Sequence, residues 1–427
     1  MAKEIVFVVG KNPLEEVGGG HSSYVRAHAR AAIRAGFLPH LFCVGRTDGT
    51  SETDYGIIHQ MRSPLRRLLT HAANQGTRVS TIPWNEPTLA AGVERFLRNR
   101  KGPQLIHGFG LWGSAGVIAS RRLRRREVEA IPIVNAYTSL EHEHLGKRMG
   151  VNRDHGDGAW FGAKAEYHWI KRVIGRYERR AYFGSQVVLF NYESVRWLLL
   201  DRFGPGMRFR KMSYSSEMAF TQRDETQQPD PPRSVAALEP RAATLVVAIS
   251  RHDPRKGVDV LLRALAELRE RGVAFRACLV GGGQLLEQHR GLAERLNLNG
   301  TVTIEGFAPD AYAYLRHADV FVLPSLEEGS GSVSLLEALQ AGAAVVASNV
   351  DGIPEDVADG DSALLVEPGN ASVLSGAIER VLNDHALRRR LARRAREVFN
   401  EKFSAGAFTG ALRETYAELG VFSDVSA

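Results

Sequence analysis

The sequence has little cysteine and no long apolar run, and both absences limit what the protein can be. Cys43 and Cys278 are the two cysteines among 427 residues, and each lies inside an apolar stretch. We therefore expect buried free thiols and a reducing compartment rather than a disulfide scaffold. No stretch approaches the roughly 20 apolar residues that cross a membrane. The opening MAKEIVFVVG also lacks the apolar core of a secretory signal. These features predict a cytoplasmic protein.

Several short motifs are absent as well. The glycine-rich loop at Gly18–Gly20 does not form the GxGxxG fingerprint of dinucleotide enzymes. No zinc-finger spacing and no aromatic–basic RNA motif occurs, so we expect no nucleic-acid partner. The net charge of +7 is carried largely by arginine clusters such as Arg121–Arg126. Such clusters suit phosphorylated small molecules or a peripheral contact with the anionic inner face of a membrane, and they also occur as plain solvated helix faces.

Alternating strand and helix patterns run through the chain twice. The first series opens with a strand–helix–strand pattern over residues 4–44, which is typical of a βαβ unit. Gln227–Arg241 is rich in proline and polar residues and indicates a connector. The pattern restarts at Thr244–Ile249. We predict an α/β protein with two Rossmann-like, doubly wound domains facing each other across a cleft, one over residues 1–228 and one over residues 242–400.

One stretch of the second half combines a strand, a glycine-rich loop and a helix start. Val320–Leu323 predicts a buried parallel strand, and the loop after it carries Glu328 and Gly331. Ser334 and Glu337 have the spacing of a capping box, so we predict that Ser334 caps the helix. Such a helix start aims backbone N–H groups at an anionic or hydroxyl-rich ligand. The alternative is an ordinary strand–helix connection whose acids face water.

Two cations follow the strand that opens the second half. Arg251 and Lys256 lie five positions apart in the loop after Thr244–Ile249. A guanidinium fork and a mobile ammonium are suited to a diphosphate that gains charge as it leaves. An exposed basic loop is the alternative interpretation.

The order of five motifs carries a resemblance to a known family. The chain resembles the retaining nucleotide-sugar glycosyltransferases with the two-domain B-type fold (GT-B), in particular glycosyltransferase family four. The resemblance is continuous over residues 245–382 and weaker over residues 1–214. The matching segments are GGGHSSYVRAHARAAIRAGF, SRHDPRKGVDVLLRAL, LVGGGQLLEQHRGLAERLNLNGTVTIEGF, ADVFVLPSLEEGSGSVSLLEALQAGAAVVAS and DGIPEDVADGDSALLVEPGN.

The resemblance implies roles for residues at the matching positions. Arg251 and Lys256 would grip the donor diphosphate, and Glu328 would be the first acid of the family's acid pair, near the sugar hydroxyls. Glu337 would bind the donor ribose, and the backbone at Phe307 would hold the base. The full set of donor-binding residues that we expect beside the catalytic residues Arg251, Lys256 and Glu328 is Gly19, Gly20, Phe307, Gly331, Ser332, Val333 and Glu337.

The sequence departs from the family in two places. Glu328 and Glu337 are nine positions apart, whereas the family spacing is eight, so the loop bulges near Gly331 or Glu328 is displaced. The family usually offers a histidine after the strand that corresponds to residues 131–137, where this chain has Tyr137 and Thr138. The candidates for the acceptor side are therefore His21, His107 and Tyr137, with His142 and His144 as further substitutes.

The resemblance implies a retaining hexosyltransferase that moves a sugar from a UDP- or GDP-sugar to an unidentified acceptor. We expect no bound cofactor, because the nucleotide-sugar would be a co-substrate. No DxD-like carboxylate pair is well placed in a loop to hold a metal, so we also expect no metal ion. The resemblance also implies that the last helix, residues 404–419, returns to the first domain. Two alternatives remain open: a nucleotide-sugar 2-epimerase on the same fold, and a non-catalytic relative that binds a nucleotide-sugar or glycan.

Overall fold

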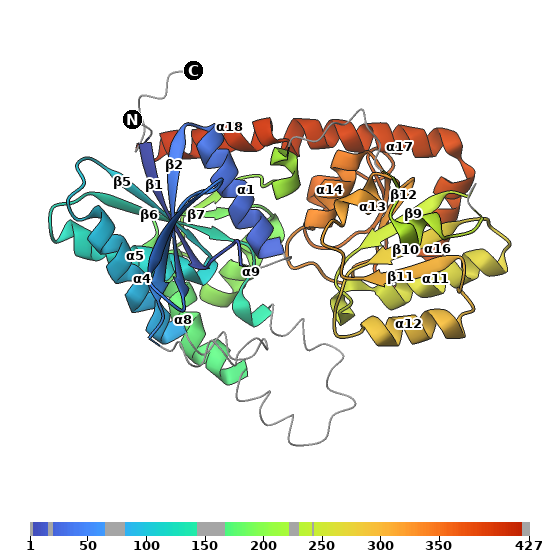
Figure 1. Ribbon diagram of the computed structural model, residues 1–427, viewed down its shortest axis with the longest axis horizontal. Coiled ribbons are helices and arrows are strands. Elements are labelled where there is room, and N and C mark those ends of the chain that lie inside the picture. The colour runs from blue at the N-terminus through green and yellow to red at the C-terminus, as the bar shows by residue number, and fades with distance from the viewer. Residues whose placement is uncertain are drawn as a thin grey trace. The chain divides into compact units, whose positions relative to one another are not determined.

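The computed structural model describes residues 3–15, 20–64, 82–142, 167–221, 230–240 and 243–420, without the side chains of residues 20 and 21. The chain divides into two compact units (Figure 1). Unit 1 comprises Met1–His144, Asp154–Phe220 and Ala405–Ala427, and unit 2 comprises Leu145–Arg153 and Thr221–Ser404. The last segment of the chain is thus grouped with unit 1, although the segment before it belongs to unit 2.

Unit 1 is built around an eight-stranded sheet in the order β3-β4-β2-β1-β5-β6-β7-β8. All neighbouring strands are parallel except β3 and β4, which form an antiparallel hairpin at one edge. The central strands are apolar and buried on both faces, as parallel strands require. The strands are β1 Lys3–Lys11, β2 Phe37–Gly45, β3 Gly49–Thr53, β4 Gly56–Arg62, β5 Gln104–Phe109, β6 Ala130–Ala136, β7 Val187–Phe190 and β8 Phe209–Lys211.

Helices cover both faces of this sheet (Figure 1). On one side α4 packs against α5 and α5 against α8, and on the other α1 packs against α18. A π-helical turn, Ile170–Ile174, leads directly into α8, so residues 167–184 form one continuous helix. The helices are α1 Gly20–Arg34, α4 Ile82–Leu97, α5 Gly113–Arg124, α8 Gly175–Gly184, α9 Glu193–Phe203 and α18 Ala405–Glu418.

A buried polar network joins α1, the sheet and α18 inside unit 1. The Nδ2 group of Asn135 donates to the Tyr24 hydroxyl at 2.8 Å and to Nε2 of His28 at 2.9 Å. Nδ1 of His28 then donates to the Tyr24 carbonyl at 2.9 Å. Oδ1 of Asn135 accepts from Nε2 of His107 at 2.7 Å, so the Tyr416 hydroxyl donates to Nδ1 of His107 at 2.8 Å. Each ring nitrogen is used once, which holds both imidazoles neutral in a single tautomer.

Unit 2 repeats the doubly wound plan with a six-stranded parallel sheet in the order β11-β10-β9-β12-β13-β14. The first strand, β9, lies in the middle, and the chain adds strands first on one side and then on the other. The strands are β9 Leu245–Ile249, β10 Arg276–Val280, β11 Val302–Gly306, β12 Val320–Leu323, β13 Ala344–Ser348 and β14 Leu364–Val366.

The helices of unit 2 lie on both faces of its sheet (Figure 1). α11 packs against α12 and α16, and α14 packs against α17. The core between sheet and helices is made of aliphatic side chains, and it includes the buried leucines of α11. The helices are α10 Arg233–Ala236, α11 Val258–Glu270, α12 Leu286–Arg295, α13 Tyr312–Leu315, α14 Val333–Ala341, α15 Ile353–Asp356, α16 Ala371–Asn383 and α17 His385–Val398.

The structure confirms the prediction for the two cysteines. Cys43 and Cys278 are both buried free thiols, as predicted, and burial raises the pKa of each to about 12. Within the described ranges, no helix combines the length and the apolar character that crossing a membrane requires.

The buried histidines make the stability of unit 1 depend on pH. Burial lowers the pKa of His107 to about 4 from its ordinary 6.5. Below about pH 6.5 the unfolded chain binds a proton at this histidine that the folded protein does not bind. The contribution of His107 to the free energy of unfolding is therefore fully present above about pH 6.5 and is lost as the pH falls toward 4. We expect His107→Gln, which keeps a donor and an acceptor but cannot titrate, to reduce the acid-induced loss of unfolding free energy by roughly 1–3 kcal/mol. Denaturant titrations at several pH values test this, and parallel pH curves for parent and variant would contradict it.

Candidate functional site

The clustered residues of unit 2 lie at the carboxyl edge of its sheet. β9 and β12 are hydrogen-bonded neighbours at the point where the strand order reverses. In open α/β sheets the loops that leave such a switch point diverge, and ligands bind beyond the strand ends there. The loops in question are residues 250–257 after β9 and residues 324–332 after β12.

The two loops are joined through their backbones. The Arg255 carbonyl accepts hydrogen bonds from the amides of Leu326 at 2.7 Å and Glu327 at 3.2 Å. Gly257 has a φ of +58° and lies so close to the second loop that a Cβ there would be 2.1 Å from the Pro324 oxygen. Glycine is therefore required at 257 both for the left-handed backbone and for the close approach. The chemistry of one loop is thus fixed relative to the other.

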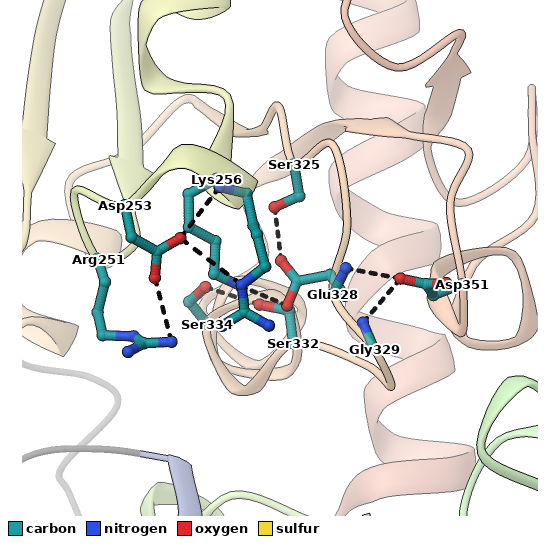
Figure 2. Close-up of polar contacts among 10 residues, drawn as sticks. Arg251, Asp253, Lys256, Ser325, Glu328, Gly329, Ser332, Ser334 and Asp351 are labelled. Atoms are coloured by element: carbon teal, nitrogen blue, oxygen red, sulfur yellow. Dashed lines mark hydrogen bonds and ion pairs between the residues drawn. The ribbon is translucent and has the colours of Figure 1, made fainter. Parts of the chain in front are cut away.

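Asp253 organises the first loop. Its Oδ1 accepts from the Arg255 amide at 3.2 Å, which caps the short helical turn Pro254–Lys256. Its Oδ2 lies 3.2 Å from a terminal nitrogen of Arg251, as Figure 2 shows. Asp253 is buried, whereas the Arg251 side chain is half exposed. The aspartate therefore holds the guanidinium of Arg251 at the surface of the loop, where a ligand can reach it.

Lys256 and Glu328 form a nearly buried ion pair between the two loops. Lys256 Nζ is 2.6 Å from Glu328 Oε2, and the two side chains are 13% and 4% exposed. The Ser325 hydroxyl donates to the other carboxylate oxygen of Glu328 at 2.5 Å (Figure 2). We call residues 324–332, which carry Glu328, the acid loop. The structure thus brings together two of the three predicted catalytic residues, although this loop is one residue longer than in the family. It leaves the Lys256 charge balanced by a carboxylate that another anion could replace.

His252 attaches the first loop to the glycine turn after β10 and to α12. Its backbone amide donates to the Gly282 carbonyl at 2.9 Å, and its carbonyl accepts from the Leu285 amide at 3.0 Å. Its Nδ1 lies 2.8 Å from Nδ1 of His289 on α12, and both rings are buried. Burial lowers the pKa of His252 to about 4, so the pair is neutral at neutral pH and one ring donates to the other. This contact could not be predicted from the sequence, because the two histidines come from different elements.

The start of α14 differs from the prediction. The helix begins at Val333 and its N-cap is Ser332, so the predicted capping role of Ser334 is wrong. Ser334 is the second helical residue, and its hydroxyl lies 3.0 Å from that of Ser332. The Ser332 side chain does not cap the first turn, which suits a ligand that accepts hydrogen bonds from the helix start. Glu337 lies half buried on α14, beyond that first turn.

Phe307 directly follows β11, which is an edge strand of the sheet. Its side chain is 57% exposed, although it is a large aromatic. The amide of Gly281 donates to the Gly306 carbonyl at 2.7 Å, so the loop of Phe307 is attached to the glycine turn after β10. A Cβ at Gly282 would lie 3.5 Å from Phe307. The structure thus places this loop next to the turn that also supports His252.

The candidates from the first half of the chain fare differently. His107 is fully buried and both of its ring nitrogens are hydrogen-bonded, so the predicted acceptor-side role of His107 is wrong. The Tyr137 ring packs edge-on against Tyr24 at 4.3 Å, and burial raises the pKa of the Tyr137 hydroxyl well above its ordinary value. The acceptor-side role of Tyr137 stays a prediction. Gly19, His144 and the side chain of His21 lie outside the described residues, and Gly20 is the first residue of α1.

Two residues of the site were missed in the sequence. Ser325 is the second residue after β12, and its hydroxyl donates to Glu328. Asp351 follows β13 and accepts hydrogen bonds from the backbone of the acid loop (Figure 2). Its place in a loop after a parallel strand at the same sheet edge was the available signal, since such loops meet at one edge.

Residues 235–398 match the family described as glycosyl transferases group 1. The matched residues all lie in unit 2 and make up less than half of the chain. The lipopolysaccharide core biosynthesis glycosyltransferase LpsE of Rhizobium meliloti is 34% identical over 178 residues, which are 42% of this chain and 51% of LpsE. The chain therefore matches about half the length of that relative.

Solved structures extend the likeness to the whole fold. Sucrose-phosphate synthase from Thermosynechococcus elongatus superimposes with a TM-score of 0.71 at 21% identity, over 98% of this chain and 99% of that one. HepE of Anabaena, in complex with UDP-glucose, gives 0.66 at 18% identity, over 97% and 99%. At these identities the likeness concerns the fold, and the prediction of two Rossmann-like domains of the GT-B type is confirmed.

The close approach at Gly257 gives a stability test with a matched control. Gly257→Ala places a methyl group against the Pro324 carbonyl, whereas Gly360→Ala meets no atom within 4 Å at a similar φ of +72°. Both changes incur the left-handed penalty of about 1–2 kcal/mol. We expect Gly257→Ala to lose roughly 1–3 kcal/mol more of the unfolding free energy of unit 2, because of the added clash. Equal losses in denaturant titrations would show that the loops are not held as described.

Proposed function

We propose that the protein is a glycosyltransferase that moves a sugar from a nucleoside diphosphate-sugar to an acceptor hydroxyl or amine. The observation that carries this proposal is the convergence of Arg251, Lys256 and the start of α14 at one sheet edge. This convergence occurs at the switch point of unit 2, the unit that matches the family described as glycosyl transferases group 1. UDP-glucose in HepE, a protein of the same fold, supports a nucleotide-sugar as donor. A UDP- or GDP-sugar fits equally well.

The two cations have different tasks in this proposal. Arg251 is half exposed and presents a planar fork to two oxygens of the diphosphate. Lys256 is held by Glu328 until the donor arrives, and a phosphate oxygen then takes the place of the carboxylate. As the bond between the sugar and the diphosphate breaks, negative charge grows on the leaving oxygen. Cations already placed beside that oxygen stabilise the transition state more than the ground state.

The remaining donor contacts follow from position. The first-turn amides of α14, at Val333 and the residues after it, face the same loop edge and suit phosphate or sugar hydroxyl oxygens. Glu337 is the acid for the ribose hydroxyls, and the backbone at Phe307 holds the edge of the base. Glu328, released from Lys256, accepts hydrogen bonds from sugar hydroxyls.

We propose retention at the anomeric carbon and no metal ion. The sugar–phosphate bond breaks while the acceptor oxygen attacks the anomeric carbon from the same face, and the acceptor proton passes to the leaving phosphate oxygen. No protein nucleophile is needed in this sequence of events. Arg251 and Lys256 supply the positive charge that a metal ion would otherwise bring, so chelation with EDTA should leave turnover unchanged.

The Lys256 charge is the direct target for mutation. Lys256→Ala removes one of the two cations beside the leaving diphosphate, and we expect turnover to fall roughly 10²–10³-fold. Lys211→Ala, which removes a half-exposed lysine in unit 1, serves as a charge-matched control and should retain parental turnover. Steady-state kinetics with a nucleotide-sugar that the parent uses provide the measurement, and near-parental turnover of Lys256→Ala would refute the assignment.

Glu328 beside Lys256 is also the arrangement that an acid/base pair of a nucleotide-sugar 2-epimerase would need. Incubation of the protein with a panel of UDP- and GDP-sugars separates the two functions. We expect sugar transfer to an added acceptor, or slow hydrolysis of the donor without one, and a product with the donor's anomeric configuration by NMR. An epimerised donor formed without acceptor would support the epimerase. Thermal stabilisation by a nucleotide-sugar without any turnover would indicate a binding protein.

A further inference from the structure

We propose that Asp351 is the positioning residue that fixes the acid loop, and through Glu328 the ammonium of Lys256. This inference rests on the proposed function, because it assigns a role within the same site. Asp351 lies in the loop after β13, the strand next to β12 in the sheet. It therefore reaches the acid loop from the neighbouring strand rather than from the loop itself.

The contacts of Asp351 are directed at the backbone of the acid loop. Its Oδ2 accepts from the amide of Glu328 at 2.6 Å and from the amide of Gly329 at 2.7 Å. Gly329 has a φ of +74°, which turns two successive N–H groups toward one point. Such a nest of amides binds an anion, and a carboxylate makes short, charge-assisted hydrogen bonds with it. Figure 2 shows Asp351 on one side of Glu328 and Lys256 on the other.

The backbone of Asp351 is itself unusual. Its φ is +49°, a left-handed conformation that residues other than glycine rarely adopt, and that Asp and Asn tolerate best. The next residue, Gly352, donates its amide to the Ser330 carbonyl at 2.9 Å. The strained turn thus binds the acid loop in two ways, through the Asp351 carboxylate and through the Gly352 amide. Strain of this kind persists where the surrounding structure holds it and clusters at functional sites.

The position of Glu328 explains why the acid loop needs the hydrogen bonds to Asp351. Four residues with two glycines separate Glu328 from the first residue of α14, so the helix by itself does not fix the carboxylate. The Asp351 carboxylate fixes the Glu328 amide, Ser325 fixes one carboxylate oxygen, and Lys256 takes the other. Without the first of these contacts, the loop that carries Glu328 gains conformations in which Lys256 and the sugar hydroxyls are not aligned.

Two variants, Asp351→Gly and Asp351→Asn, separate a role in positioning the acid loop from a role in folding. Asp351→Gly removes both hydrogen bonds while it relaxes the backbone, so the fold should persist. Asp351→Asn keeps an acceptor oxygen and a residue that tolerates the left-handed backbone, so it should hold the acid loop as the parent does. Asp359→Gly is the matched control, because it removes another aspartate–amide hydrogen bond of unit 2, to Leu365.

The first readout does not depend on activity. Hydrogen–deuterium exchange of the peptide that covers residues 324–333 should be at least about tenfold faster in Asp351→Gly than in the parent. Asp351→Asn and Asp359→Gly should exchange in this peptide as the parent does. Unchanged exchange in Asp351→Gly would overturn the positioning role, whether or not the protein transfers sugar.

The second readout is kinetic. We expect Asp351→Gly to lower kcat about 10- to 100-fold with a smaller change in the KM for the donor, because misaligned groups cost turnover more than binding. In a Glu328→Gln background, the same change should lower kcat no further, since Asp351 acts through Glu328. A parent without transfer activity would refute the proposed function alone. An active parent with an equally active Asp351→Gly, or with additive losses in the double variant, would refute the positioning role.

Discussion

The ion pair between Lys256 and Glu328 is the contact on which the site of unit 2 depends. Both charges are almost fully removed from water, and removing either partner of such a pair leaves an uncompensated buried charge. The ammonium is therefore retained only while an anion stands opposite to it. In the proposed function, a diphosphate takes the place of the carboxylate, because it brings more charge and more acceptor oxygens.

The two loops that carry this pair are held by backbone contacts rather than by apolar packing. The Arg255 carbonyl joins them, Gly257 permits their close approach, and His252 anchors the first loop to the glycine turn after β10. Hydrogen bonds to the backbone fix atoms more narrowly than the non-directional burial of side chains does. The sheet supplies the place, and these polar contacts supply the geometry that charge stabilisation requires.

Much of the fold was predictable from the sequence, because periodicity reports which faces of strands and helices are buried. Val320–Leu323 is a strand with the predicted bounds, and the strand–helix pattern restarts at β9 as predicted. The hairpin β3–β4 was missed because its first strand is mostly exposed and polar. His107 was misassigned for a related reason, since a histidine after apolar residues looks the same in sequence whether a ligand or a buried network binds it.

The pairing of Lys256 with Glu328 could not be predicted, since it depends on how two loops from different strands are attached. A structure with a bound nucleotide-sugar would decide whether the ion pair exchanges its anion. We expect Lys256 Nζ to leave Glu328 and to lie within hydrogen-bonding distance of a diphosphate oxygen, with Arg251 on the same diphosphate. A complex in which Lys256 stays paired with Glu328 while the diphosphate binds elsewhere would contradict it.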